Sequence, residues 1–318
     1  MPRWGSGRTE VRVSTYADQH RDPPTIGAGL SIKGAADLLG VPAPTLRSWE
    51  RRYGLPTTGR SVGGHRRYRP AELIQLSLMR DEIAIGRQAA DAARRVRGML
   101  DESNPGVARV HALLAASHRR DSPAIRVALE TANDELGLAA TLDDLVMPAM
   151  RQIGAWWETG DCEVDQEHFT TAVVRSWLAK VATLAPAPAA GSRTVVLATG
   201  PADSHTLGLE ALAALLAEQG LASRLLGPRT STAALVAAAT TADDALVVVV
   251  SHLPTQRRAA IASLDAAAAL GVPTLFAGNA FLFPASRKNV PGAYLGESLG
   301  EAALVISRFD GSPETFVP

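Results

Sequence analysis

From residue 194 to residue 309 the sequence alternates short apolar runs with longer runs rich in alanine and leucine. The short runs have the length and the valine and leucine content of buried strands. They are Thr194–Ala198, Ala222–Leu226, Ala245–Ser251, Pro273–Ala277 and Gly292–Leu295. Helices are expected between and after them, at Leu207–Gly220, Ser231–Ala239, Thr255–Leu270 and Glu297–Phe309, with a short irregular piece near 281–288. Such alternation is typical of a parallel sheet covered on both faces, so we predict a doubly wound α/β domain over residues 193–310.

The loop after the first of these strands carries a histidine between an aspartate and a glycine. Asp203, His205 and Gly208 lie where the strand gives way to its helix. Ligands bind at the carboxyl ends of strands in such folds, and a histidine oriented by a carboxylate is a common metal ligand. The residues alone leave a second interpretation open, in which His205 is a loop histidine that only hydrogen-bonds its neighbour.

The Asp-x-His-x-x-Gly spacing resembles the signature of cobalamin-binding domains. The resemblance implies that His205 replaces the cofactor's own base as the lower axial ligand to cobalt. It also implies a flavodoxin-like (Rossmann-like) fold for this domain, with Asp203 and Gly208 as parts of the cofactor site.

Two other expected strand ends extend this resemblance. Ser251 and Leu253 match the Ser-x-Leu of the same domain class, which implies that the Ser251 hydroxyl meets the displaced nucleotide tail of the cofactor. Gly278 is followed by Asn279, where the family usually has Gly-Gly. Gly278 is expected to leave room for the tail, and asparagine is tolerated next to it because it also accepts positive φ.

Residues 107–184 have the periodicity of four helices and predict an all-helical bundle. The expected helices are Val107–His118, Ser122–Leu136, Thr141–Trp157 and Glu163–Leu184. We expect Asp121 or Ser122 to cap the second helix, and a Thr-x-x-Asp pattern at Thr141 and Asp144 to cap the third. A linker rich in proline and alanine precedes the α/β domain.

A tryptophan at the end of the third expected helix precedes a Glu-His pair. Nine residues separate Trp157 from Glu167 and His168. This spacing resembles the helical cap of adenosylcobalamin-dependent light-sensing repressors of the CarH or LitR type. The resemblance implies that Trp157 packs over the upper face of the cofactor against the adenosyl group, and that Glu167 and His168 line the same cavity. The alternative is that Trp157 is a core residue of the bundle.

One residue departs from that family pattern. Glu158 follows Trp157, where light-responsive members typically carry a histidine implicated in ligating cobalt once the adenosyl group is lost. Cobalamin binding is still expected, whereas the ligation state after illumination is left open.

The N-terminal third carries a local excess of positive charge. Residues 31–69 contain eight lysine and arginine residues against two aspartate and glutamate residues, a difference of six. Helices are expected at Ser31–Gly40, Thr45–Tyr53 and Ala71–Ile83, with the helical pattern continuing over Asp81–Leu100. Two short helices joined by a tight turn, the second rich in arginine, are typical of a helix-turn-helix and favour a polyanionic partner.

The order of these elements resembles the MerR-type winged DNA-binding domain, above all in Gly64-His-Arg-Arg-Tyr-Arg-Pro70. The resemblance implies a winged helix-turn-helix over residues 30–100. Its recognition helix would carry Arg47, Arg51 and Arg52 into the major groove, where arginine suits bidentate contacts. The wing residues expected on the phosphate backbone are His65, Arg66, Arg67 and Tyr68. The alternative is a solvated basic domain that binds no nucleic acid.

Composition excludes several other classes. Cys162 is the only cysteine, so neither a disulfide framework nor a thiol-based metal centre is expected. There is no uncharged apolar run of roughly eighteen residues and no apolar signal core, so we expect a cytoplasmic protein without membrane contact. Residues 1–29 are polar and aperiodic and are expected to form a disordered tail. No Walker motif is present, and we expect no enzymatic activity.

Together these features predict a multidomain, cobalamin-dependent transcriptional regulator that binds double-stranded operator DNA as a homo-oligomer, either a dimer or a tetramer. The family resemblance further implies a repressor whose assembly is driven by adenosylcobalamin, or another cobalamin, and reversed by light. Two alternatives stay open. A MerR-type regulator could sense cobalamin concentration without light, or it could sense another small molecule.

Overall fold

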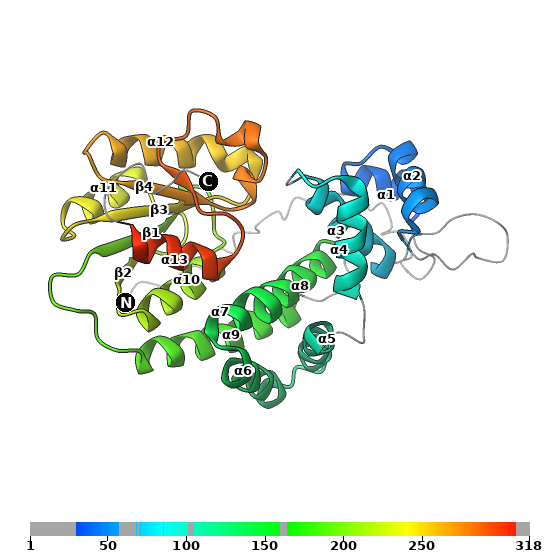
Figure 1. Cartoon of the computed structure of the whole chain (residues 1–318), viewed down its shortest axis with the longest axis horizontal. Helices are drawn as coiled ribbons and strands as arrows, with labels where there is room; N and C mark the ends of the chain where they lie inside the picture. The colour runs from blue at the N-terminus through cyan, green and yellow to red at the C-terminus, as the bar shows by residue number, and fades with distance from the viewer. Residues whose placement is uncertain are drawn as a thin grey trace, which may run out of the picture.

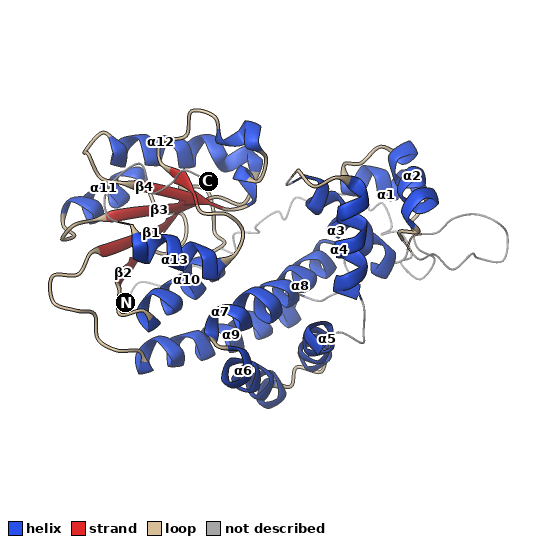
Figure 2. Cartoon of the chain, in the orientation of Figure 1, coloured by secondary structure: helices blue, strands red, loops and turns tan. Residues whose placement is uncertain are grey.

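The computed structural model describes residues 30–56, 68, 70–84, 86–100, 105–159 and 164–309. Along the chain these residues form an N-terminal helical region, a helical bundle and an α/β domain (Figures 1 and 2). The expected tail and the wing residues His65, Arg66 and Arg67 lie outside the described residues. Among the described helices, none is long and apolar enough to cross a membrane.

The N-terminal region contains the expected helix-turn-helix. Its described helices are α1 (Ile32–Leu39), α2 (Ala43–Tyr53), α3 (Pro70–Ala84) and α4 (Ala89–Leu100). Ser31 caps α1 by accepting a hydrogen bond from the backbone N–H of Gly34. Gly40 ends α1 and Gly54 ends α2, each in the left-handed conformation that glycine adopts at low cost. These local signals position α2, the arginine-rich helix.

The sequence predicts a continuous helical pattern over Asp81–Leu100. This prediction is wrong, because the helix is interrupted between α3 and α4. Gly86 has a φ of +97°, which lies outside the helical region and interrupts the hydrogen-bond pattern. The two helices are then joined by side chains, since Arg95 Nε donates to Glu82 Oε1 at 3.0 Å. Glycine in an otherwise helical pattern marks this turn.

The bundle begins as the sequence predicts. Its described elements are α5 (Pro105–His118), α6 (Ser122–Leu136), α7 (Leu138–Thr141), the π-helical turn η2 (Leu142–Val146), α8 (Met147–Thr159) and α9 (Val164–Leu184). Asp121 caps α6 by accepting from the backbone N–H of Ala124. Trp177 on α9 is 3% exposed and belongs to the core.

The predicted cap at Thr141 and Asp144 is wrong. The helical segment already begins at Leu138, and Thr141 is a buried helical residue whose side chain makes no capping hydrogen bond. The chain then passes through η2 into α8 without an intervening loop. The π-helical turn places Asp143, and not Asp144, against the α/β domain, as described below.

The α/β domain matches the sequence prediction closely. Its elements are β1 (Thr194–Thr199), α10 (Leu207–Glu218), β2 (Ala222–Leu225), α11 (Thr232–Thr240), β3 (Leu246–Val250), η3 (Pro254–Gln256), α12 (Arg257–Ala268), β4 (Thr274–Ala277), η4 (Asn279–Phe281), η5 (Pro284–Arg287), β5 (Ala293–Tyr294) and α13 (Leu299–Arg308). The strands are parallel and lie in the order β2-β1-β3-β4-β5. This is the flavodoxin-like order.

Successive residues of β1 point into different cores, as the two-residue period of a strand requires. Val195 and Leu197 join the core that includes α10 and α13, whereas Val196 and Ala198 join the core that includes α11 and α12. The sheet therefore has helices on both faces (Figure 1).

The bundle and the α/β domain share one apolar core. Leu113 and Trp177 of the bundle belong to the same cluster as Leu209 and Ile306 of the α/β domain. The carboxylate of Asp143 also caps α13, accepting from the backbone N–H of Leu299 at 2.7 Å and of Gly300 at 3.0 Å. These contacts attach the bundle to one face of the sheet.

Candidate functional site

The sheet order fixes where a ligand site is expected. In the order β2-β1-β3-β4-β5, the connections leave β1 and β3 in opposite directions, so the loops after these two strands diverge. The loop after β1 carries Asp203 and His205, and the loop after β3 carries Ser251 and His252. The predicted site residues thus come from the topological switch point of the fold.

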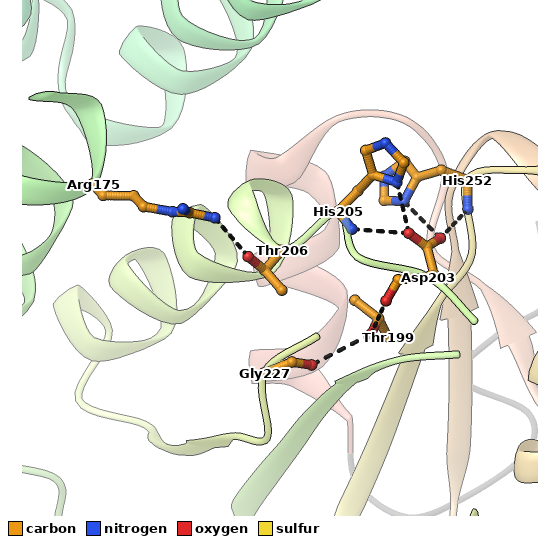
Figure 3. A network of polar contacts seen from close by, with 7 residues as sticks. All are labelled: Arg175, Thr199, Asp203, His205, Thr206, Gly227 and His252. Atoms are coloured by element: carbon orange, nitrogen blue, oxygen red, sulfur yellow. Dashed lines mark hydrogen bonds and ion pairs between the residues drawn. The ribbon is translucent and has the colours of Figure 1, made fainter. Parts of the chain in front are cut away.

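Asp203 is the centre of this site (Figure 3). Its side chain is fully buried and receives hydrogen bonds on both oxygens. Oδ1 lies 2.9 Å from the backbone N and 2.7 Å from Nδ1 of His205. Oδ2 lies 2.6 Å from the backbone N and 3.1 Å from Nδ1 of His252. One carboxylate therefore joins the two loops at the switch point.

The charge of Asp203 is held by these donors. Burial alone raises the pKa of a carboxyl group, but here the hydrogen bonds from His205 and His252 outweigh it and hold the pKa of Asp203 well below its usual range. The carboxylate is consequently an acceptor only, so each imidazole presents Nδ1–H to it and carries its lone pair on Nε2. His205 thereby directs a metal-binding nitrogen away from Asp203.

The bundle reaches the same loop through Arg175 of α9. Its Nη2 donates to Thr206 Oγ1 at 2.8 Å (Figure 3). Its Nε lies 2.9 Å from Glu210 Oε2. Thr206 directly follows His205 and precedes α10, so Arg175 ties the start of α10 to the bundle. The His205 side chain itself is 57% exposed. Arg175 therefore holds the loop from the side of the bundle.

The residues around His205 fit a large ligand with a polar tail. The Oγ of Ser251 is fully buried, and no group in the described part of the chain forms a hydrogen bond with it. A buried hydroxyl of this kind is costly unless a partner arrives. Gly208 has open space where a Cβ would stand, with no heavy atom within 4 Å. Leu253, at the same strand end, is 44% exposed.

Gly278 has a structural role of its own at this edge of the sheet. A Cβ there would lie 2.3 Å from the backbone oxygen of Ser251, and its φ is +100°. The glycine is therefore required by the close approach of the loops after β3 and β4. Asn279 begins the 3-10 turn η4 beside it.

The three predicted cap residues lie outside the Asp203 cluster. Trp157, near the end of α8, is 52% exposed, so it is not a core residue of the bundle. Glu167 Oε1 accepts a hydrogen bond from Thr171 Oγ1 at 2.8 Å. Glu167 Oε2 lies 3.4 Å from His168 Nε2. The His168 side chain is 74% exposed. The structure gathers Asp203, His205 and His252 within reach of one another and leaves Trp157, Glu167 and His168 on the bundle surface.

His252 is a site residue that the sequence analysis did not identify. It stands between Ser251 and Leu253, at the position that the Ser-x-Leu pattern leaves unspecified. The available signal was its position at the end of a strand, because the loops after neighbouring parallel strands meet at one edge of the sheet.

A second region of interest surrounds Glu297, which follows β5. Desolvation raises the pKa of Glu297, whereas Arg151 of α8 and Arg87, which follows α3, lower it; Glu82 of α3 adds a repulsive charge. Residues from the N-terminal region, the bundle and the α/β domain therefore act electrostatically on one carboxyl group.

Ser298 lies at the centre of a Gly-x-Ser-x-Gly spacing between Gly296 and Gly300, a spacing shared with hydrolase nucleophiles. The hydroxyl of Ser298 makes two hydrogen bonds that stabilise the start of α13. Oγ accepts from the backbone N–H of Glu301 at 3.0 Å and donates to Asp143 Oδ2 at 2.8 Å. Ser298 is thus a helix cap, and no described histidine forms a hydrogen bond with it.

On the N-terminal region, α2 presents its arginines to solvent. Arg47, Arg51 and Arg52 are exposed, while Leu46 and Trp49 on the other face are buried. The prediction for Tyr68, in contrast, is wrong.

We expected Tyr68 on a phosphate-binding wing, but its side chain is fully buried. It forms an isolated antiparallel bridge with Leu30 and packs in the N-terminal core. A fully buried side chain cannot contact DNA, so Tyr68 is not a DNA-binding residue in this structure.

Comparison with known proteins agrees with this arrangement. Residues 31–68 match the MerR family regulatory protein model, and residues 110–181 and 193–306 each match a B12 binding domain model. The transcriptional repressor CarH of Myxococcus xanthus is 34% identical over 212 residues, which cover 62% of this chain and 70% of CarH. The chain belongs to the CarH family of HTH-type transcriptional repressors. The repressor CarA of the same organism is 28% identical over 226 residues, covering 65% of this chain and 70% of CarA.

The family matches contain the site residues described above. Asp203, His205, Ser251 and Gly278 fall in the second B12-binding match, and α2 falls in the MerR match. This member of the CarH family therefore combines a MerR-family DNA-binding region with cobalamin-binding domains. Among solved structures, the monomethylamine corrinoid protein of Methanosarcina barkeri has a TM-score of 0.48 and 16% identity, covering 61% of this chain and 94% of that one.

Proposed function

We propose that this chain is a light-responsive repressor in which His205 would ligate the cobalt of adenosylcobalamin. The observation that carries the proposal is the pairing of His205 with buried Asp203 at the switch point, in a chain that also presents the α2 arginines. Bound adenosylcobalamin would supply a cobalt–carbon bond that light can cleave.

Each remaining site residue has a role that its surroundings support. Asp203 holds the Nδ1–H of His205 and keeps Nε2 available as a ligand. The buried Ser251 hydroxyl hydrogen-bonds the nucleotide tail, which satisfies an otherwise unpaired group. Gly208 provides space beside the loop.

Trp157 covers the adenosyl side of the cofactor in this proposal. It is a large, half-exposed aromatic side chain on a bundle that already packs against the α/β domain. Burial of its open face by an adenosyl group would stabilise the bound state. Glu167 and His168 lie one connection further along the chain, at the start of α9, and line the same side.

The same proposal places operator DNA on α2 and gives the cofactor control of assembly. Arg47 and Arg51 are one helical turn apart and exposed, with Arg52 next to them, as a recognition helix requires. Self-association of the cofactor-bound protein would then hold several such helices on neighbouring half-sites and tighten DNA binding without new contacts within each copy. The chain would act as a regulator and not as an enzyme.

A second candidate is a regulator that responds to cobalamin concentration and not to light. Glu158 favours it, because this residue stands where light-responsive relatives typically have a histidine. Both candidates use Asp203 and His205 in the same way, and they differ in the response to illumination.

Illumination of the loaded protein distinguishes them. The full chain is incubated with adenosylcobalamin in the dark, desalted, and examined by absorption spectroscopy and gel filtration before and after illumination. Retained cofactor with an irreversible spectral change and a parallel change in size supports the light-responsive repressor. Retained cofactor without a change in assembly supports the concentration sensor, and no retained cofactor contradicts both.

A further inference from the structure

The further inference concerns His252, the second histidine on Asp203. Its contacts mirror those of His205: each residue supplies a backbone N–H and an imidazole Nδ1 to one oxygen of the carboxylate. The two rings lie with centroids 5.1 Å apart and are tilted by 48° (Figure 3). Asp203 is thus held from two loops, with His205 on one carboxylate oxygen and His252 on the other.

We propose that His252 is a positioning residue that fixes the Asp203 carboxylate and so sets the direction in which His205 presents Nε2. The inference deepens the proposed function, on which its cofactor-binding part rests. His252 acts through Asp203 and touches neither substrate nor cofactor in this scheme.

Burial distinguishes the two histidines. Both use Nδ1 on Asp203, but the His252 side chain is 25% exposed and the His205 side chain 57%. The more open imidazole has the access that a planar macrocycle requires. The more enclosed one is held by the protein and is suited to support.

His252 matters because it donates to a buried, negatively charged carboxylate. Asp203 is an ionised side chain with no exposed surface, and in the described part of the chain no lysine or arginine forms a hydrogen bond or ion pair with its carboxylate. Loss of the His252 imidazole leaves Oδ2 with a single backbone donor. A buried carboxylate that loses a donor rotates to recover one or admits water, and either change alters the hydrogen bond that orients His205.

The orientation has a defined chemical signature. While both carboxylate oxygens accept hydrogen bonds, His205 is locked as the Nδ1–H tautomer with its lone pair on Nε2. If the carboxylate turns, this tautomer loses its anchor, and His205 samples both tautomers and several ring orientations. Second-shell partners of this kind typically change metal affinity by about 10- to 100-fold when they are removed.

The test uses the full chain labelled with ¹⁵N-histidine, first without cofactor. The variants are His252→Ala, which removes the imidazole donor, and His252→Asn, whose amide can donate from near the position of Nδ1. His118→Ala is the control, because His118 is an exposed histidine at the end of α5. We expect the His205 ring signal to report the Nδ1–H tautomer in the wild type, the control and His252→Asn, and a mixed or broadened signal in His252→Ala.

Titration of the same proteins with adenosylcobalamin in the dark then measures the consequence. We expect His252→Ala to weaken binding by about 10- to 100-fold and His252→Asn to recover most of that loss. An unchanged His205 tautomer in His252→Ala overturns the inference, even if cobalamin binding is weakened in that variant. Wild-type protein that binds no cobalamin refutes the proposed function. If its His205 tautomer is locked and this lock is lost in His252→Ala, the positioning of His205 by His252 is still confirmed. Loss of axial nitrogen ligation in His252→Ala but not in His205→Ala would make His252 the ligand and also overturn the inference.

Discussion

Asp143 Oδ1 accepts a hydrogen bond from the backbone N–H of Leu299 at 2.7 Å, although 156 positions separate the two residues in the sequence. The aspartate lies in the π-helical turn η2 of the bundle, and the leucine begins the last helix of the α/β domain. A carboxylate at a helix N-terminus satisfies unpaired N–H groups and meets the positive end of the helix dipole. The attachment of the bundle to the α/β domain is therefore partly electrostatic.

Replacement of Asp143 by alanine should destabilise the protein by about 1–3 kcal/mol, because three donors of the α13 terminus lose their acceptor. Urea denaturation measures the loss. Asp144→Ala is the matched control, since Asp144 is its exposed neighbour in η2. Equal stability of the two variants would show that the cap contributes nothing.

The two glycines of the site should behave in opposite ways. Gly278→Ala should cost about 2–4 kcal/mol in stability, because its Cβ would meet the Ser251 backbone oxygen and its φ is positive. Gly208→Ala should leave stability unchanged or raise it by up to about 1 kcal/mol, since it lies in α10 with open space around it. Thermal unfolding of the cofactor-free protein checks both. A tolerated Gly278→Ala would contradict the close approach of the two loops.

Asp203 should make stability fall on acidification. Its pKa in the folded protein lies below the value in the unfolded chain, so its contribution is present above the unfolded pKa and is lost as the pH falls. Between about pH 5 and pH 3, the wild type should lose more stability than Asp203→Asn, which has no carboxyl group to protonate. Denaturant midpoints across this range provide the measurement. Asp134→Asn, at an exposed position of α6, should retain the wild-type pH profile.

Arg51→Ala should weaken operator binding by about 1–3 kcal/mol if its guanidinium reads a base. Arg94→Ala is a suitable control, because Arg94 is an exposed arginine of α4 paired with Asp91. Fluorescence anisotropy with operator DNA and with an unrelated duplex separates the contributions. An equal loss on both duplexes would assign Arg51 to the phosphate backbone, and no loss on either would exclude α2 as the recognition helix.

The sequence predicts the α/β domain well because its signals are local. The valine-rich runs around Val196 and Val248 and the helices between strands lie within one or two residues of their expected positions. The capping signals are local as well: the side chains of Ser31 and Asp121 cap the helices that follow them. Apolar periodicity and capping depend on neighbours a few residues apart, so a single sequence contains them.

What the sequence could not predict depends on distant contacts. Thr141 and Asp144 form a plausible capping pattern, but the turn before them is helical and the neighbouring Asp143 binds a helix from another domain. Tyr68 stands among arginines, which suggests a surface, yet its pairing with Leu30 buries it. His252 can be recognised as a site residue only when β1 and β3 are known to be neighbours.

His205 is the residue proposed to ligate bound cobalamin, and this role can be tested directly. The decisive measurement is a dark titration of wild-type protein, His205→Ala and His118→Ala with adenosylcobalamin, followed by absorption spectroscopy. We predict that the wild type and His118→Ala bind the cofactor with the same affinity and spectrum, and that His205→Ala binds it more weakly or shows a different cobalt spectrum. Unchanged affinity together with an unchanged spectrum in His205→Ala would contradict the account.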